Sequence, residues 1–196
     1  MKKRKYTKSL RAEQQGQTRD RIVEAAMMLH EELGPAHTSI KAVAEKAGVQ
    51  RLTVYRYFPD DVSLFQACTS HWLALNPPPD MNEWSELLDA RERSQTALLS
   101  FYQYYRSTEA MWTVSYRDVD KVIALQEPMA QIEAYIDQVC DDLVKVWKKT
   151  KHSKKQLQVT LRHALRFSTW QSLKNAKLKD EKITELVESW LEGVIG

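Results

Sequence analysis

One period runs through almost the whole sequence: apolar residues recur at every third or fourth position. In residues 17–33 these residues are Ile22, Ala25, Ala26, Leu29 and Leu33, and the same spacing returns up to Val194. This spacing places the side chains on one face of an α-helix. No stretch alternates polar and apolar residues as a half-buried strand does, and only five glycines and six prolines interrupt the chain. The sequence therefore predicts an all-α protein.

Composition excludes several other classes. The 196 residues are 43% hydrophobic and 28% charged, which is ordinary for one or two folded domains and unlike a disordered chain. No run of 18 apolar residues predicts a transmembrane helix. The basic start MKKRKYTKSLR is followed by no apolar segment, so we expect no secretory signal. Cys68 and Cys140 form no CxxC motif, which favours a reducing compartment, and we expect a cytoplasmic protein.

Positive charge is concentrated in the N-terminal third of the chain. Residues 1–60 hold 12 Lys and Arg against 7 Asp and Glu, whereas the remainder holds 17 against 19. The N-terminal part is therefore suited to a polyanion such as nucleic acid. A solubilising tail is the alternative, because six of these cations lie within the first eleven residues.

Glycines and prolines divide the N-terminal part into three helices. Gly34–Pro35 ends the first one. Thr38 or Ser39 can cap a short second helix. Gly48 ends it, because glycine adopts the left-handed conformation with the least strain. A third short helix covers residues 50–58 and stops before a proline, since the residue preceding a proline disfavours the α conformation.

The segment Gly48–Asp61, GVQRLTVYRYFPDD, carries more polar side chains than a short helix can bury. Two short helices joined by a glycine turn, with the second rich in donors, are typical of a helix-turn-helix. Arginine can donate two hydrogen bonds to guanine, while hydroxyls and tyrosines reach phosphates or thymine methyl groups. An ordinary helical corner with solvated cations is the alternative interpretation of the spacing alone.

Residues 19–68 together resemble the tetracycline-repressor (TetR) family of bacterial transcriptional regulators. The resemblance rests on the Ile–Ala–Ala helix, Gly34, the step Thr38-Ser39-Ile40, the run Ala44-Glu45-Lys46-Ala47-Gly48-Val49, and the block Thr53-Val54-Tyr55-Arg56-Tyr57-Phe58. It implies an all-α fold in which an N-terminal three-helix DNA-binding domain with a helix-turn-helix precedes a C-terminal helical ligand-binding and dimerisation domain.

The resemblance also implies roles for single residues. Arg51, Leu52 and Tyr55 match positions that read bases in the major groove. Thr38, Gln50, Arg56 and Tyr57 match phosphate contacts, and Thr53 matches either role. The family usually has a lysine where this chain has Asp61, next to Asp60. Two carboxylates repel a phosphate, so that usual contact is in doubt and the basic N-terminus is a candidate to replace it.

The strongest break in the sequence is Asn76-Pro77-Pro78-Pro79, where we place a domain boundary. The expected organisation is a basic disordered or helical arm at 1–16, the helix-turn-helix domain at 17–76, and a helical effector-binding and dimerisation domain at 77–196. Helices expected in the last domain are Asn82–Ser107, one with Pro128 in its first turn, Ser153–Leu178 and Asp180–Val194, with a short aromatic segment at 109–119.

The last two expected helices carry wide apolar faces. The resemblance implies that they pair with their copies in a homodimer, and a helix-turn-helix commonly reads palindromic half-sites as a dimer. The expected interface residues are Leu161, Leu165, Ile183, Leu186, Val187 and Trp190. A monomer that packs both faces internally is the alternative.

Residues 84–147 are rich in aromatic side chains, which with a few polar groups make good ligand walls. Candidate ligand-binding residues are Arg91, Gln95, Tyr102, Tyr105, Trp112 and Tyr116. Arg91 and Gln95 interrupt an apolar face, so we expect them at or near the core. The alternative is that these aromatics are simply core.

The motifs of common enzymes and metal sites are absent from the sequence. There is no HExxH, no GxSxG and no phosphate-binding glycine loop, and we expect neither catalysis nor a cofactor or metal. Cys68 and His71 lie three residues apart on a helix, without an evident third group. Three functions stay open: a homodimeric repressor released from a pseudo-palindromic operator by a small effector, a DNA-binding protein controlled by a protein partner, and a helical ligand-binding protein or enzyme with a vestigial helix-turn-helix.

Overall fold

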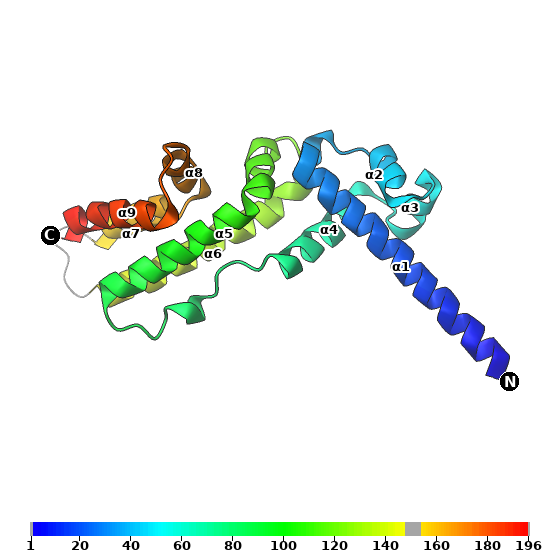
Figure 1. The fold of residues 1–196 in the computed structure, drawn as a ribbon, viewed down its shortest axis with the longest axis horizontal. Helices are drawn as coiled ribbons and strands as arrows, with labels where there is room; N and C mark the ends of the chain where they lie inside the picture. Colours follow the sequence, from blue (N-terminus) through cyan, green and yellow to red (C-terminus); the bar gives the residue numbers. More distant parts are fainter. Residues whose placement is uncertain (1, 148–153, 196) are drawn as a thin grey trace. The chain divides into compact units, whose positions relative to one another are not determined.

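The computed structural model describes the backbone of residues 2–147 and 154–195 and the side chains of residues 13–147 and 154–194. Within these ranges the chain forms nine α-helices and two short 3-10 helices, with no strand (Figure 1). The prediction of an all-α protein is confirmed.

The chain divides into two compact units. Unit 1 comprises residues 1–77 and 113–128, and unit 2 comprises residues 78–112 and 129–196. The first division falls beside the triple proline, where the sequence places a boundary. The inclusion of residues 113–128 in unit 1 was not anticipated. Two helices, α5 (Ala90–Asp118) and α6 (Ile123–Val146), therefore carry residues of both units.

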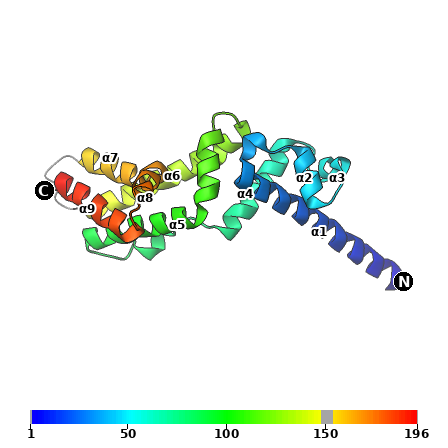
Figure 2. The same cartoon turned by 45° about the horizontal axis from the view of Figure 1, so that its top comes forward.

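Unit 1 is built on a long first helix. Its helices are α1 (Lys2–Leu33), η1 (Pro35–His37), α2 (Ile40–Ala47), α3 (Arg51–Tyr57) and α4 (Asp61–Leu75). The apolar face of α1 forms a core with α2, α3 and α4, in which Ile22, Ala26 and Val54 are fully buried. The expected arm at 1–16 continues the same helix from Lys2, and its first turns run out beyond α2–α4 (Figures 1 and 2). The side chains of residues 1–12 lie outside the described part.

Unit 2 contains η2 (Met81–Glu83), most of α5 and α6, and three further helices. These are α7 (Lys154–Ala164), α8 (Phe167–Asn175) and α9 (Asp180–Ile195). Two expected boundaries differ. The helix expected to start at Asn82 starts only at Ala90, and it runs on through most of the aromatic segment expected at 109–119 to form α5, which bends at Thr108 (φ −120°, ψ 15°). Helix α6 begins at Ile123, so Pro128 lies inside it and not in its first turn.

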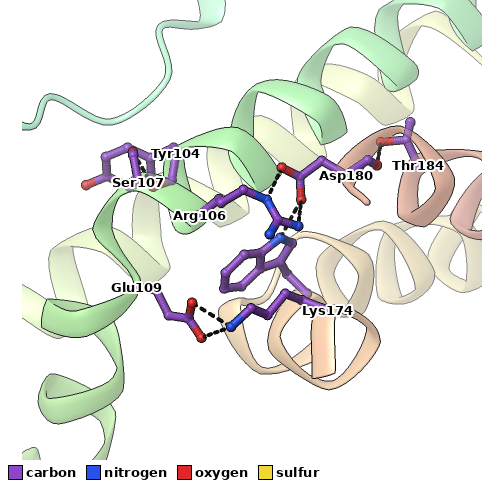
Figure 3. A network of polar contacts seen from close by, with 8 residues as sticks. Tyr104, Arg106, Ser107, Glu109, Lys174, Asp180 and Thr184 are labelled. Atoms are coloured by element: carbon purple, nitrogen blue, oxygen red, sulfur yellow. Dashed lines mark hydrogen bonds and ion pairs between the residues drawn. The ribbon is translucent and has the colours of Figure 1, made fainter. Parts of the chain in front are cut away.

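Two ion pairs hold the bend of α5 (Figure 3). Before the bend, Arg106 binds the carboxylate of Asp180 at 2.6 and 2.7 Å, and the indole N–H of Trp170 donates to the same carboxylate at 2.9 Å. After the bend, Glu109 accepts from Lys174 at 2.8 Å. These contacts tie α5 to α8 and to the first residue of α9.

The single helix expected at 153–178 is wrong, because the chain breaks between α7 and α8. Three backbone carbonyls at the break accept hydrogen bonds from side chains. Thr169 donates to His163 O at 2.6 Å, and the hydroxyls of Tyr102 and Tyr105 donate to Ala164 O and Leu165 O at 3.0 and 2.8 Å. Buried tyrosines from α5 therefore stabilise a break for which the local sequence has no proline or glycine.

Candidate nucleic-acid interface

The turn between α2 and α3 is fixed by its backbone. Gly48 adopts the left-handed conformation (φ 65°), its N–H donates to Glu45 O at 3.2 Å, and the N–H of Val49 donates to Ala44 O at 3.0 Å. These two bonds make a Schellman motif, which satisfies the last carbonyls of α2. The turn therefore holds α3 in a defined direction relative to α2.

Helix α3 is anchored by its inner face. Val54 is fully buried, and Phe58, directly after the helix, is 4% exposed. Both pack into the core that α1, α2 and α4 share. The guanidinium of Arg19 on α1 covers the ring of Phe58 at 5.2 Å, a contact that the sequence pattern did not indicate. With Val54 turned inward, the opposite side of α3 must face outward.

The outer face of α3 contains most of the predicted DNA-binding residues. Gln50, Arg51, Leu52, Tyr55 and Arg56 are exposed, and Thr53 and Tyr57 are half-buried. Leu52 is 79% exposed, although burial of a leucine side chain is favourable by about 1.5–3 kcal/mol. An apolar side chain held out on a polar helix suits contact with a thymine methyl group. The guanidinium of Arg56 lies 5.4 Å from the centroid of the Tyr57 ring.

Thr38 lies just before α2, half-buried. Its hydroxyl donates to Gly34 O at 3.0 Å, and its backbone N–H donates to Pro35 O at 3.3 Å. The side chain of the next residue, Ser39, caps α2 by accepting from Ala42 N at 3.2 Å. The hydroxyl proton of Thr38 is therefore used to stabilise the turn before α2. A hydrogen bond from this hydroxyl to a phosphate would need the same proton.

The two carboxylates at the start of α4 have different roles. Asp60 caps the helix by accepting from Ser63 N at 2.7 Å, and this backbone hydrogen bond lowers the pKa of Asp60. Asp61 lies exposed in the first turn. An open groove of about 490 Å³ between α1 and α4 is lined by Arg19, Ser63, Gln66 and His71 among others. The groove adds polar groups to unit 1 outside α3.

The two polar candidate ligand residues, Arg91 and Gln95, differ in burial. Arg91 is exposed and pairs with Glu192 at 2.5 Å, so the expectation that it lies at the core is wrong. The inward arginine is Arg93, 7% exposed, which binds the carboxylate of Asp142 at 2.6 and 2.7 Å. Gln95 is half-buried. The helical period alone did not decide which of two arginines two residues apart would face inward.

The aromatic candidates are part of a packed cluster in unit 2. Tyr105 lies 5.5–6.0 Å, centroid to centroid, from five other rings. The members are Phe101, Tyr104, Tyr105, Trp112, Phe167 and Trp170. Tyr102 is fully buried beside them, while Tyr116 is half-buried and belongs to unit 1. The indole N–H of the buried Trp84 finds no hydrogen-bond acceptor among the described residues.

The candidate interface residues are mostly internal. Leu161, Leu165, Ile183 and Val187 are fully buried within the protomer. Leu186 is 37% exposed and Trp190 is half-buried. The sequence pattern did not separate the inner from the outer face of α9, because both are rich in apolar residues.

Cys68 contacts His30, and not His71, which lies three residues away from it in the sequence. Its sulfur lies 3.3 Å from Nδ1 of His30 on α1, and His71 is exposed. Burial raises the pKa of the Cys68 thiol to about 12 and lowers the pKa of His30 to about 4. Both groups are therefore neutral at pH 7, which makes the thiol a poor nucleophile.

The described residues lack the features of a metal site and of a membrane span. No three His, Cys, Asp or Glu side chains there converge as a metal site would require. Among the helices described, none combines the length and apolar character needed to span a membrane.

Comparison with known proteins places the helix-turn-helix in a family. Residues 22–68 match the model for bacterial regulatory proteins of the tetR family. No curated protein matches the chain.

Solved structures match nearly the whole chain. A TetR-like transcriptional regulator from Rhodococcus sp. RHA1 is 19% identical with a TM-score of 0.62, covering 89% of this chain and 93% of its own. NalD of Pseudomonas aeruginosa, the secondary repressor of the MexAB-OprM multidrug efflux pump, is 18% identical with a TM-score of 0.60, covering 93% and 98%. At such identities these likenesses show the fold. Residues 22–68 therefore carry the DNA-binding domain of the tetR family of bacterial regulatory proteins, and the chain as a whole has the fold of TetR-like transcriptional regulators.

Proposed function

We propose that the protein is a homodimeric repressor that binds a pseudo-palindromic operator and is released from it by a small-molecule effector. The observation that carries the DNA-binding part is the outer face of α3, where Arg51, Leu52 and Tyr55 are exposed on a helix anchored by Val54. A regulator of bacterial DNA acts in the cytoplasm, and the likeness to regulators argues against an enzyme.

The side chains of α3 divide by chemistry. Arg51 can donate two hydrogen bonds to guanine, and Leu52 can contact a thymine methyl group. Tyr55 completes the base-reading face. Gln50, Arg56 and Tyr57 flank it and contact phosphates, and Thr53 serves either role. Thr38 contributes by holding the turn before α2, because its hydroxyl proton is already donated to Gly34 O.

The first test is selection of bound duplexes from genomic fragments, followed by variants. Arg51→Ala should weaken operator binding by about 1–3 kcal/mol and relax the preference at one base pair. Arg56→Ala, which removes the same charge from the same helix, should weaken all duplexes alike. Half-site centres should lie about 34 Å apart or a few base pairs wider. Equal losses on operator and random duplex for Arg51→Ala would refute its base-reading role.

The homodimer is proposed to use the outer face of α9. Trp190 is half-buried and Leu186 partly exposed there. Trp190→Glu places an unpaired charge in an apolar interface, which is unfavourable. Sedimentation should show a monomer with weakened operator binding, whereas Ser189→Glu, on an exposed position of the same helix, should stay dimeric. A dimeric Trp190→Glu protein at micromolar concentration would place the interface elsewhere.

The effector site is proposed beside the aromatic cluster of unit 2. The N–H of Trp84, which has no acceptor among the residues that the structure describes, and the half-buried Gln95 supply polar groups at an apolar wall, as small-molecule sites require. A useful inducer must favour the DNA-free state by about 1–3 kcal/mol. Aromatic and cationic-aromatic compounds should raise the melting temperature of the wild type, and active ones should release DNA. Trp112→Ala and Gln95→Ala should weaken this response.

A protein partner in place of the effector is the second candidate function. In this candidate the DNA-binding face of α3 is the same, but unit 2 binds a protein and not a small molecule. If no compound shifts the melting temperature and purified protein still represses, regulation by a partner is favoured.

A further inference from the structure

The turn between α1 and α2 is held by two residues from far along the chain. Arg117 donates from Nη2 to Leu33 O, the last carbonyl of α1, at 2.7 Å. Oδ2 of Asp118 accepts from the backbone N–H of Ala36, within the turn, at 3.2 Å. The two side chains also bind each other at 2.8 and 2.9 Å. One arginine–carboxylate pair therefore makes hydrogen bonds to the backbone both before and after Gly34.

Gly34 leaves room for this pair. Its φ of 92° lies in the region that favours glycine. A Cβ built there would overlap the guanidinium of Arg117 and the carboxylate of Asp118. Glycine at position 34 therefore serves two needs, the backbone conformation and the close approach of the pair.

The pair is built as a charged hydrogen-bonding unit. The Asp118 side chain is fully buried, while that of Arg117 is 45% exposed. The guanidinium holds the pKa of Asp118 down at about 2, with the Ala36 N–H adding to the effect. A buried carboxylate in this state must keep its donors, because losing one leaves an uncompensated charge.

The turn leads directly into the helix-turn-helix. Gly34 O accepts from the hydroxyl of Thr38 and from the N–H of His37. Ser39 then caps α2, and the Schellman turn at Gly48 fixes α3 on α2. The position of the DNA-facing side of α3 therefore depends on a chain of local contacts that begins at the turn.

We propose that Arg117 and Asp118 are positioning residues for DNA binding, which hold the turn at residues 34–38 and through it the orientation of α2 and α3. The proposal rests on the proposed function of α3 in DNA binding. Arg117 and Asp118 are the last two residues of α5. The residues of α5 up to Trp112 belong to unit 2 and contribute to the aromatic cluster.

The test compares Arg117→Ala with Lys121→Ala. Lys121 is an exposed cation three residues beyond Asp118, so its removal takes away the same charge nearby but no bond to the turn. Arg117→Ala should weaken operator binding by about tenfold or more, as expected for a lost charged hydrogen bond. The slope of log affinity against log salt should stay unchanged, since a positioning residue contacts no phosphate. Lys121→Ala should bind nearly as the wild type does.

Hydrogen exchange measures the positioning directly. In Arg117→Ala and Asp118→Asn, amides of residues 34–42 should exchange faster than in the wild type, while amides in the buried half of α1 should not. If Arg117→Ala fails to fold, Arg117→Lys, which keeps the charge but not the two-pronged geometry, takes its place.

Three results would overturn the proposal. They are wild-type affinity in the Arg117 variants, unchanged exchange at residues 34–42, and a salt slope reduced by about one, which indicates a direct phosphate contact. Failure of the wild type to bind any duplex is a separate result, because it refutes the proposed function itself.

Discussion

Tyrosines in the two units contrast in their use. On α3 of unit 1, Tyr55 is 42% exposed. On α5 of unit 2, Tyr102 and Tyr105 are buried, and their hydroxyls donate to the carbonyls of Ala164 and Leu165. The same residue type therefore faces solvent in one unit and completes the backbone hydrogen bonding of a broken helix in the other.

The contrast shows that aromatic content alone does not identify a binding site. The short helix α3, anchored by Val54, leaves Arg51, Leu52, Tyr55 and Arg56 exposed, whereas the aromatic residues of α5 in unit 2 pack against one another and against α8. Exposure, and not composition, separates the recognition surface from the core.

The largest effect on stability should come from a buried aromatic residue of unit 2. Trp170 is fully buried, lies 5.6 Å from the ring of Phe167 and donates to Asp180. Trp170→Ala should lower the free energy of unfolding by about 3–5 kcal/mol. Tyr55→Ala on α3 should change it by less than about 0.5 kcal/mol. Urea unfolding of both variants measures the difference, and similar losses would erase the distinction between the two regions.

Acid should act next most strongly, and in unit 1. His30 has its pKa lowered from 6.5 to about 4 by burial. Its neutral state contributes stability that is fully present above pH 6.5 and is lost as the pH falls toward 4, because the unfolded chain takes up the proton first. The loss should reach about 3 kcal/mol.

Denaturant unfolding at a series of pH values checks this dependence on His30. His30→Gln should lack this part of the pH profile, while a variant of the exposed His71 should keep it. An unchanged profile in His30→Gln would assign the acid sensitivity to other groups.

Removal of single hydroxyls sharpens the comparison between the tyrosines. Tyr105→Phe leaves Leu165 O without its donor and should cost about 1–3 kcal/mol of stability. Tyr55→Phe should leave stability unchanged within about 0.5 kcal/mol and alter only DNA affinity. Thermal unfolding and operator titration of both variants separate the two effects.

The smallest effect is expected at Leu52. Since it is 79% exposed, Leu52→Ala should leave the unfolding free energy within about 0.5 kcal/mol of the wild type. If Leu52 contacts a thymine methyl group, replacing that thymine by uracil should weaken binding of the wild type but not of the variant. Equal losses in both proteins would show that the methyl group is not contacted.

Features that depend on local sequence were predicted well. Helix α9 begins at Asp180 as expected. Gly48 adopts the left-handed conformation that its place between two short helices requires. The outward face of α3 followed from the number of polar residues in a short helix. Each of these features is set by residues within one or two turns of one another.

Features that depend on distant partners were missed. Arg93 faces inward because Asp142, 49 residues away in sequence, binds it. The break after α7 exists because Tyr102 and Tyr105 supply donors across 62 and 60 residues. The expected interface residues Leu161 and Val187 are buried in the protomer's own core.

The sequence by itself therefore determined an all-α chain, the helix-turn-helix and the exposed residues of α3. The tertiary structure alone decided that residues 113–128 join unit 1 and that Arg117 and Asp118 hold the turn at Gly34. The physical reason is range. Helical period and glycine conformation act between neighbours in sequence, whereas an ion pair or a hydrogen bond to a free carbonyl forms wherever folding brings its two groups together.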